Sequence, residues 1–194
     1  MLTEAPDHKP APKKRQLRQK SSHNIGVAAE AIAAAQFARC GFDVSVQYGA
    51  SQPEYDLIVA RGDDLLKVSV KGSQDGAWGL TQAFIKATTA DYHGAIERWL
   101  ARHGQKTDFC FVQFANVRLD ELPRVYLATP AEVAQRLREA RKGRGDSILY
   151  ERHEWTGRAH GAGTIEEIPA SWRFSEARVQ ELLAGAWELI GISL

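Results

Sequence analysis

Cysteine is scarce in this sequence, and its scarcity excludes two kinds of protein. The 194 residues contain only two cysteines, Cys40 and Cys110, and both lie inside apolar stretches. Their number and spacing fit neither a disulfide framework nor a zinc cluster. Such cysteine usage suits a reducing compartment, so we expect a cytoplasmic location.

Long apolar runs are also absent. No segment reaches the roughly 20 apolar residues that a membrane helix needs, and no apolar run of signal-peptide length follows the charged N-terminus. We therefore expect no membrane association. With 44% hydrophobic and 25% charged residues, the chain has the composition of one globular domain with a sizeable core.

Excess charge is missing too, because the formal net charge is only +1. A global basic field of the kind that many DNA-binding domains carry is thus excluded. The basic residues near the N-terminus are nevertheless concentrated in one apolar-poor segment, namely Lys9, Lys13, Lys14, Arg15, Arg18 and Lys20. For residues 1–22 this composition predicts a disordered basic arm that follows phosphates, although a solubilising tail explains it equally well. Residues 23–194 then form the single folded domain.

Hydrophobic periodicity predicts the elements of that domain. Helical spacing marks a first helix over 24–40, with Asn24 as its cap and Gly41 at its end. Alternation or short apolar runs predict five strands, at about 42–46, 55–60, 65–70, 109–114 and 124–128. Further helices are expected near 92–99, from 130 to about 142 and over 179–190.

Two short segments give sharper local predictions. Arg61-Gly62-Asp63-Asp64 is turn-forming, so the second and third strands should pair as an antiparallel hairpin. Thr129-Pro130-Ala131-Glu132 has the capping threonine, first-turn proline and glutamate of a helix start. Together the elements predict an α/β domain with a central mixed sheet of about five strands flanked by helices.

Two acids occupy positions that call for an explanation. Asp56 stands inside the apolar run Tyr55–Val59, where an ionised carboxylate needs a partner, and a metal ion is one. Glu30 lies among small residues of the first helix, on a surface that permits close approach to a sheet. Taken alone, Glu30 fits a solvated helix position equally well.

A polar face runs along the third strand. Period two places Ser69 and Lys71 on one face of this strand and Val68 and Val70 on the other. A hairpin joins this strand to the one that carries the aspartate, so the two acids and Lys71 can converge at one end of the sheet. Lys71 by itself is also typical of a lysine that protects a strand edge.

These residues carry a resemblance to the PD-(D/E)xK nuclease superfamily, and to its Holliday junction resolvase-like branch in particular. The resemblance covers residues 24–71 and rests on Asn24-Ile25-Gly26, Ala29-Glu30, Gly41-Phe42, Tyr55-Asp56-Leu57-Ile58 and Val68-Ser69-Val70-Lys71-Gly72. It implies a restriction endonuclease-like fold. It also implies a DNA endonuclease, with branched DNA as a substrate and a homodimer as the assembly that coordinates two cuts.

The resemblance further implies a role for each site residue. Glu30, Asp56 and Val70 would hold Mg²⁺ or Mn²⁺, and Lys71 would position or activate the water that hydrolyses the phosphodiester. Carboxylate oxygens suit Mg²⁺, which polarises the phosphate and lowers the pKa of bound water. Lysine adds positive charge where the transition state is most negative.

Ser69 departs from the superfamily pattern, which has Glu, Asp or Gln two residues before the lysine. A serine hydroxyl is short and neutral, so it replaces little of a carboxylate's attraction for a divalent ion. A second hypothesis is therefore a catalytically degenerate module that binds nucleic acid or a protein, and a third is an α/β protein unrelated to nucleic acid. Because Pro53 precedes Glu54, a rival register would make Glu54 the acid in place of Asp56.

Several other polar residues have plainer explanations. Lys67 and Gln74 fit a solvated strand face and a loop as well as phosphate contacts. His153-Glu154 and His160 lack metal-ligand spacing and fit surface positions. Trp172-Arg173-Phe174 could stack bases, but the hydrophobic core is the safer place for most of the tryptophans.

Overall fold

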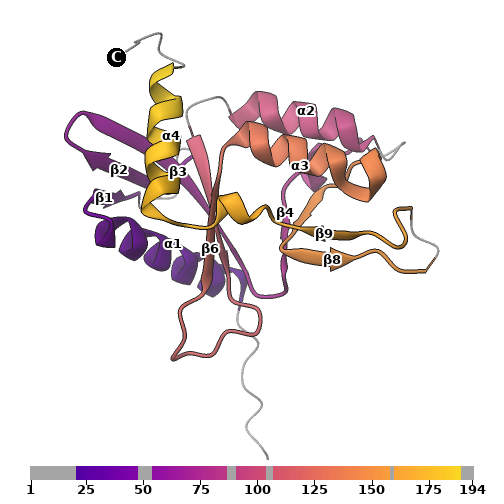
Figure 1. The fold of residues 1–194 in the computed structure, drawn as a ribbon, viewed down its shortest axis with the longest axis horizontal. Helices are drawn as coiled ribbons and strands as arrows, with labels where there is room; N and C mark the ends of the chain where they lie inside the picture. The colour runs from indigo at the N-terminus through magenta and orange to yellow at the C-terminus, as the bar shows by residue number, and fades with distance from the viewer. Residues whose placement is uncertain (1–20, 48–53, 87–90, 104–106, 158–159, 189–194) are drawn as a thin grey trace, which may run out of the picture.

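The computed structural model describes residues 21–47, 54–86, 91–103, 107–157 and 160–188. Figure 1 shows how their helices surround a central sheet. Residues 1–20, which make up nearly all of the predicted basic arm, lie outside the described residues, as does Pro53.

A five-stranded mixed sheet forms the centre of the molecule, as the sequence predicts. Its strands run in the order β1-β2-β3-β5-β6. Their bounds are Asp43–Val46 (β1), Leu57–Arg61 (β2), Asp64–Ser73 (β3), Thr107–Gln113 (β5) and Arg124–Ala128 (β6). Neighbouring strands are antiparallel except β3 and β5, which are parallel. The predicted hairpin joins β2 to β3, with Arg61 paired to Asp64 and Gly62 at a φ of 62° in the turn.

Helices cover both faces of this sheet (Figure 1). α1 (Ser22–Arg39) and α4 (Glu176–Glu188) lie on one face, and α2 (Tyr92–His103) and α3 (Pro130–Gly143) lie on the other. Strand residues alternate between the two cores because successive side chains point to opposite faces. Val68 and Val70 of β3 therefore join the core under α1, whereas Phe109 and Phe111 of β5 join the core under α2 and α3.

The helix starts agree with the predictions in one case and correct them in the other. Thr129 and Glu132 form the full capping box of α3. For α1 the predicted cap Asn24 is wrong, because Ser21 holds that position and its Oγ accepts a hydrogen bond from the Asn24 N–H at 3.3 Å. A serine three residues earlier than expected satisfies the same orphan donors, so the helix gains most of an extra turn.

Within the described ranges, four short strands lie outside the main sheet, and the sequence pattern predicts none of them. β4 (Ala77–Gly79) pairs with β7 (Ile148–Tyr150), and β8 (Arg152–Glu154) pairs with β9 (Ile165–Glu167). Each has three residues, which is too short for alternation to be read. Two 3₁₀ turns, η1 (Gln82–Phe84) and η2 (Ala170–Trp172), complete the elements.

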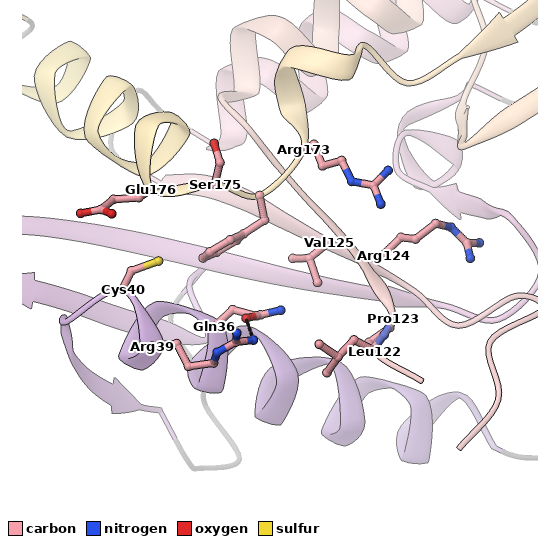
Figure 2. Close-up of a pocket in the computed structure, with 11 residues that line it drawn as sticks. Gln36, Arg39, Cys40, Leu122, Pro123, Arg124, Val125, Arg173, Ser175 and Glu176 are labelled. Carbon is pink, nitrogen blue, oxygen red and sulfur yellow. Dashed lines mark hydrogen bonds between the residues drawn. The ribbon is translucent and has the colours of Figure 1, made fainter. Parts of the chain in front are cut away.

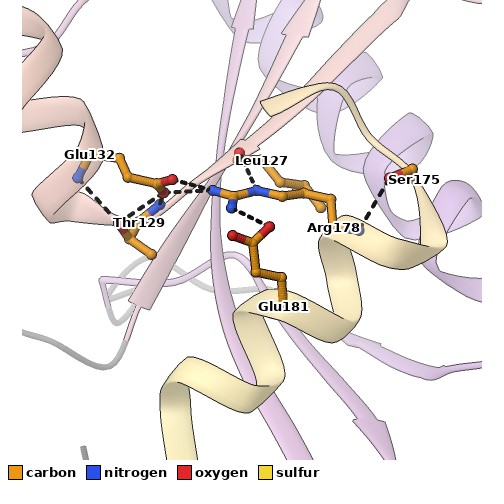
Figure 3. Close-up of polar contacts among 6 residues, drawn as sticks. All are labelled: Leu127, Thr129, Glu132, Ser175, Arg178 and Glu181. Atoms are coloured by element: carbon orange, nitrogen blue, oxygen red, sulfur yellow. Dashed lines mark hydrogen bonds and ion pairs between the residues drawn. The ribbon is translucent and has the colours of Figure 1, made fainter. Parts of the chain in front are cut away.

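A buried arginine fastens α4 to the rest of the domain (Figure 3). The guanidinium of Arg178 lies 2.6 and 2.7 Å from the two carboxylate oxygens of Glu132 on α3, and 2.8 Å from Glu181 on its own helix. Its Nε donates to the Leu127 carbonyl of β6 at 3.3 Å. With 5% of its surface exposed, Arg178 needs these partners, since a buried charge without them is costly.

None of the helices in the described part of the chain combines the length and the hydropathy that crossing a bilayer requires.

Candidate functional site

Asp56 lies directly before β2, one residue outside the strand in which the sequence analysis placed it. Its main chain still belongs to the sheet, because the Asp56 N–H donates to the Val68 carbonyl at 2.8 Å and its carbonyl accepts from Gln47 at 2.9 Å. Its side chain accepts a hydrogen bond from the Val70 N–H at 2.6 Å and a long one from the Ser69 hydroxyl at 3.4 Å.

The length of β3 explains this arrangement. β3 continues five residues past Val68, the residue paired with the first residue of β2. The Val70 N–H therefore has no partner strand on that side, and an unpaired N–H inside a protein is costly. The Asp56 carboxylate supplies the missing acceptor with Oδ2. Its other oxygen, Oδ1, has no hydrogen-bond partner among the described residues.

Glu30 reaches the same end of the sheet because α1 lies unusually close to β3. A Cβ atom added to Gly72 would stand 2.8 Å from the Ile25 carbonyl and 2.9 Å from the Ala29 Cβ, distances that real Cβ atoms do not tolerate. Glycine at position 72 thus permits the close approach. Glu30 follows Ala29 and is carried to the rim of β3.

Electrostatics shows that the two acids and the lysine are neighbours. The pKa of Glu30 is raised, first by partial burial and then by the negative charge of Asp56. The positive charges of Lys71 and His23 act in the opposite direction. The structure therefore brings Glu30, Asp56 and Lys71 together, although it gives no direct contact among their side chains.

Ser69 and Lys71 occupy the polar face of β3, on the α2 side of the sheet. Ser69 is buried, with 2% of its surface exposed, and Lys71 is half-buried. The Lys71 ammonium has no hydrogen bond or ion pair within the described residues, while its carbonyl accepts a hydrogen bond from Trp78 Nε1 at 2.9 Å. The hydrogen bond from Trp78 thus holds the main chain at this end of β3, while the Lys71 ammonium makes no such contact with the described residues.

The donor set at this place fits a hard divalent ion. No group of three His, Cys, Asp or Glu side chains in the described ranges could hold a metal. Mg²⁺ is commonly bound through only one or two carboxylates, with water and substrate oxygens completing its shell. Glu30 and Asp56 supply two carboxylates, and Val70, whose side chain is in the core, has only its carbonyl oxygen to add.

The rival acid Glu54 is exposed, and no hydrogen bond joins it to β3 in the described part of the chain. The geometry therefore favours Asp56 over Glu54. Lys67 lies over the ring of Tyr55, with its ammonium 5.1 Å from the ring centroid. His153 is stacked on Tyr150 with 4.2 Å between ring centroids, and Trp172 is buried, so neither belongs to this site.

His103, the last residue of α2, was missed by the sequence analysis. Its ring packs against Trp99 and Phe109, with centroid distances of 4.8 and 5.2 Å. Burial lowers its pKa, Glu54 acts to raise it, and Lys71 and Arg102 lower it further. A histidine at the end of an amphipathic helix gives no sequence signal for a site, because only the fold brings it beside β3.

A separate pocket of about 400 Å³ lies between the C-terminal end of α1, the start of β6 and the segment before α4 (Figure 2). Arg39, Arg124 and Arg173 stand around it. Two of these guanidinium groups already have partners, since Arg124 binds Glu151 at 2.6 Å and Arg39 binds the Gln36 side chain at 2.9 Å. None of the predicted site residues lines this pocket.

A comparison with known protein families identifies one family whose sequence model matches this chain. Residues 20–156 match the sequence model of a family described as PD-(D/E)XK endonuclease, and this range contains Glu30, Asp56, Ser69 and Lys71. Among solved structures, a bacterial homing endonuclease, I-Ssp6803I, aligns with 90% of this chain and 100% of its own, at 18% sequence identity and a TM-score of 0.45. No curated protein matches the chain.

Proposed function

The chain belongs to the PD-(D/E)XK endonuclease family, as its sequence predicts, and on this premise we propose that it hydrolyses DNA phosphodiester bonds at Glu30, Asp56, Ser69 and Lys71. The observation that carries the proposal is that two carboxylates lie near one end of β3 together with a lysine ammonium that has no partner among the described residues. An ordinary structural role would pair these charges with each other, as Arg178 is paired with Glu132.

Glu30 and Asp56, with the Val70 carbonyl, would hold a divalent ion, Mg²⁺ or Mn²⁺. Such an ion, when bound, polarises the phosphate and lowers the pKa of a bound water. Asp56 is suited to this task because the Val70 N–H fixes Oδ2 while Oδ1 stays available. The pKa of Glu30 is raised first by partial burial and then by the negative charge of Asp56, and a cation between the two acids would relieve both effects.

Lys71 would position the attacking water and stabilise the negative charge of the transition state. Its half-buried position strengthens this interaction, because a partly desolvated site screens charge less than bulk water does. Ser69 donates to Asp56 at 3.4 Å, so in this chain it would act through the orientation of that carboxylate.

A binding module without catalysis is the second candidate, and Ser69 is the observation that favours it. Its hydroxyl adds no negative charge where the superfamily usually has an acidic side chain or glutamine, so the metal site has only two carboxylates. Branched DNA and a homodimer follow from the resolvase branch alone and stay proposals. A cytoplasmic location likewise stays a proposal.

Cleavage of labelled linear duplex, single-stranded and four-way-junction DNA with Mg²⁺ or Mn²⁺ tests the catalytic proposal. Lys71→Met should lower the cleavage rate by about 100-fold or more, because removal of one preorganised transition-state partner has that effect. Lys67→Met is the matched control, since Lys67 lies on the same face of β3 but over Tyr55. Binding without cleavage by the unmodified protein, in either metal, would favour the binding module instead.

A further inference from the structure

His103 lies closer to the proposed site than its position in the sequence suggests. Its ring packs on Phe109 of β5, and Phe109 is paired with Ser69 in the parallel β3–β5 ladder. Paired residues on neighbouring strands are about 5 Å apart and present their side chains on the same face. The imidazole therefore sits over β5, one strand away from Ser69 and on the same side of the sheet as Ser69 and Lys71.

Only one edge of this ring is available to a ligand. Nδ1 is buried and has no hydrogen-bond partner within the described ranges. The residue as a whole is half-buried, so its exposed surface lies elsewhere than at Nδ1. Trp99 and Phe109, whose rings stack on each other at 5.3 Å, both pack against the His103 ring and fix its orientation. Nε2 is then the nitrogen that can reach a bound molecule.

The charges around the ring favour an anion. Lys71 and Arg102 are its positive neighbours and Glu54 is its negative one. Glu54 and Arg102 are both exposed, whereas Lys71 is half-buried and its ammonium lacks an ion pair within the described residues. Because burial and the two cations disfavour a second proton, the imidazole is neutral at neutral pH and carries one N–H donor. A phosphodiester oxygen carries negative charge and accepts hydrogen bonds, so it suits both this N–H donor and the two cations.

We propose that His103 is a DNA contact of the cleavage site and donates a hydrogen bond through Nε2 to a backbone phosphate oxygen beside the one that Lys71 approaches. This inference rests on the proposed function. With this contact, the C-terminal end of α2 borders the site on one side of the sheet, and α1 borders it on the other. His103 binds and orients the DNA backbone and is not a ligand of the metal.

The test is an NMR titration of the histidines in the full chain, in EDTA so that no DNA is cut, with and without a short duplex oligonucleotide. The pKa of His103 should rise by about one unit when DNA binds, since an anion favours the charged imidazole, and one unit corresponds to about tenfold tighter binding by the protonated form. The signal is identified by its loss in His103→Phe. The ring signals of His93, whose Nε2 contacts the Gly143 carbonyl at 3.0 Å, should not move when DNA is added and are the internal control.

Affinity gives the second readout. His103→Phe keeps an aromatic ring packed against Trp99 and Phe109. Its melting temperature should therefore stay close to that of the unmodified chain, while its DNA affinity falls about threefold to tenfold. His93→Gln should bind DNA as the unmodified chain does. The inference is overturned if DNA binds while the His103 pKa and the affinity of His103→Phe do not change.

The outcomes separate this inference from the proposed function. If the chain cleaves DNA and the His103 pKa stays the same, the catalytic proposal stands and the role given to His103 is wrong. If the pKa rises but no DNA is ever cleaved, His103 binds DNA and the catalytic proposal is wrong. Absence of any DNA binding overturns both.

Discussion

The charge of Glu30 lowers the stability of the fold. Its carboxylate is partly buried beside Asp56, and both conditions raise its pKa. A raised pKa means that the folded state binds the proton more tightly than the unfolded chain does. Stability is therefore lost as the pH rises from the unfolded value through the folded one, and at neutral pH the charge is destabilising.

Glu30→Gln should accordingly raise the melting temperature of the metal-free protein at neutral pH. We expect a gain below about 1 kcal/mol, because the side chain is only partly buried, and about 2–4 °C per kcal/mol for a chain of this length. The same substitution should reduce the further rise that Mg²⁺ produces, since one metal ligand is lost. Thermal unfolding with and without Mg²⁺ measures both effects, and an unchanged metal response would remove Glu30 from the site.

Asp108 gives a pH prediction that does not depend on catalysis. Burial and the nearby charge of Glu132 raise its pKa from 3.8 to about 7, although Arg178 opposes the shift. The folded chain then holds a proton that the unfolded chain has released between pH 4 and 7. Stability should fall over that window and level off above it.

Asp108→Asn, which stays neutral, should be more stable than the unmodified chain at pH 8 by about 1–3 kcal/mol, with the difference vanishing near pH 4. Urea unfolding at the two pH values is the measurement. Equal stability of the two proteins at pH 8 would mean that Asp108 ionises in the folded state without penalty.

At the scale of elements, the contact between α1 and β3 positions the site. Gly72→Ala should destabilise the protein by about 1–3 kcal/mol, because a methyl group would overlap the Ile25 carbonyl and the Ala29 side chain. It should also lower cleavage, since α1 carries Glu30. Gly26→Ala is the control on α1, with open space around the added atom and an expected gain of about 0.5–1 kcal/mol. Chemical unfolding of both variants decides the point, and equal effects would contradict the role given to Gly72.

The long elements could be predicted because their periodicity is repeated over many residues. β6 (Arg124–Ala128) was predicted with its observed bounds, and the capping box of α3 was read from four residues. The missed strands β4, β7, β8 and β9 have three residues each, so their pairing depends on tertiary neighbours and leaves no periodic pattern.

The site could be predicted only where a residue type is unusual for its local setting. Asp56 in an apolar run and Lys71 on an alternating strand have such a setting. Glu30 became a candidate only through the resemblance to the nuclease superfamily. The hydrogen bond from the Val70 N–H to Asp56 could not be predicted from the sequence. This N–H lacks a strand partner on that side only because β3 continues beyond the first residue of β2, which the fold alone reveals. The contacts of His103 and Gly72 lie between elements, so no short segment of sequence reveals them.

At the scale of the whole molecule, charge is divided between the N-terminal segment and the rest. Residues 1–20 hold 6 of the 25 basic and 2 of the 24 acidic residues, which leaves 19 basic and 22 acidic residues in 21–194. The formal charge of that remainder is −3. A DNA-binding role for a chain with this charge is easier to explain if residues 1–20, which lie outside the described residues, supply positive charge to the complex.

Deletion of residues 1–20 should therefore weaken DNA binding at low salt by about tenfold or more. It should also reduce the slope of log affinity against log salt by about 0.9 for each phosphate that the segment neutralises. Replacement of the six basic residues by glutamine is the matched variant, because it keeps the length. Unchanged affinity in both would identify the segment as a solubilising tail.

The most direct test of the proposed site is DNA cleavage by Asp56→Asn beside the unmodified chain, in Mg²⁺ and in Mn²⁺. Asparagine keeps an acceptor for the Val70 N–H, so the fold should be preserved, but it removes the charge that would hold the metal. We predict metal-dependent cleavage by the unmodified chain and its loss, by about 100-fold or more, in Asp56→Asn with DNA binding retained. Cleavage that survives in Asp56→Asn would contradict a metal site built on this carboxylate.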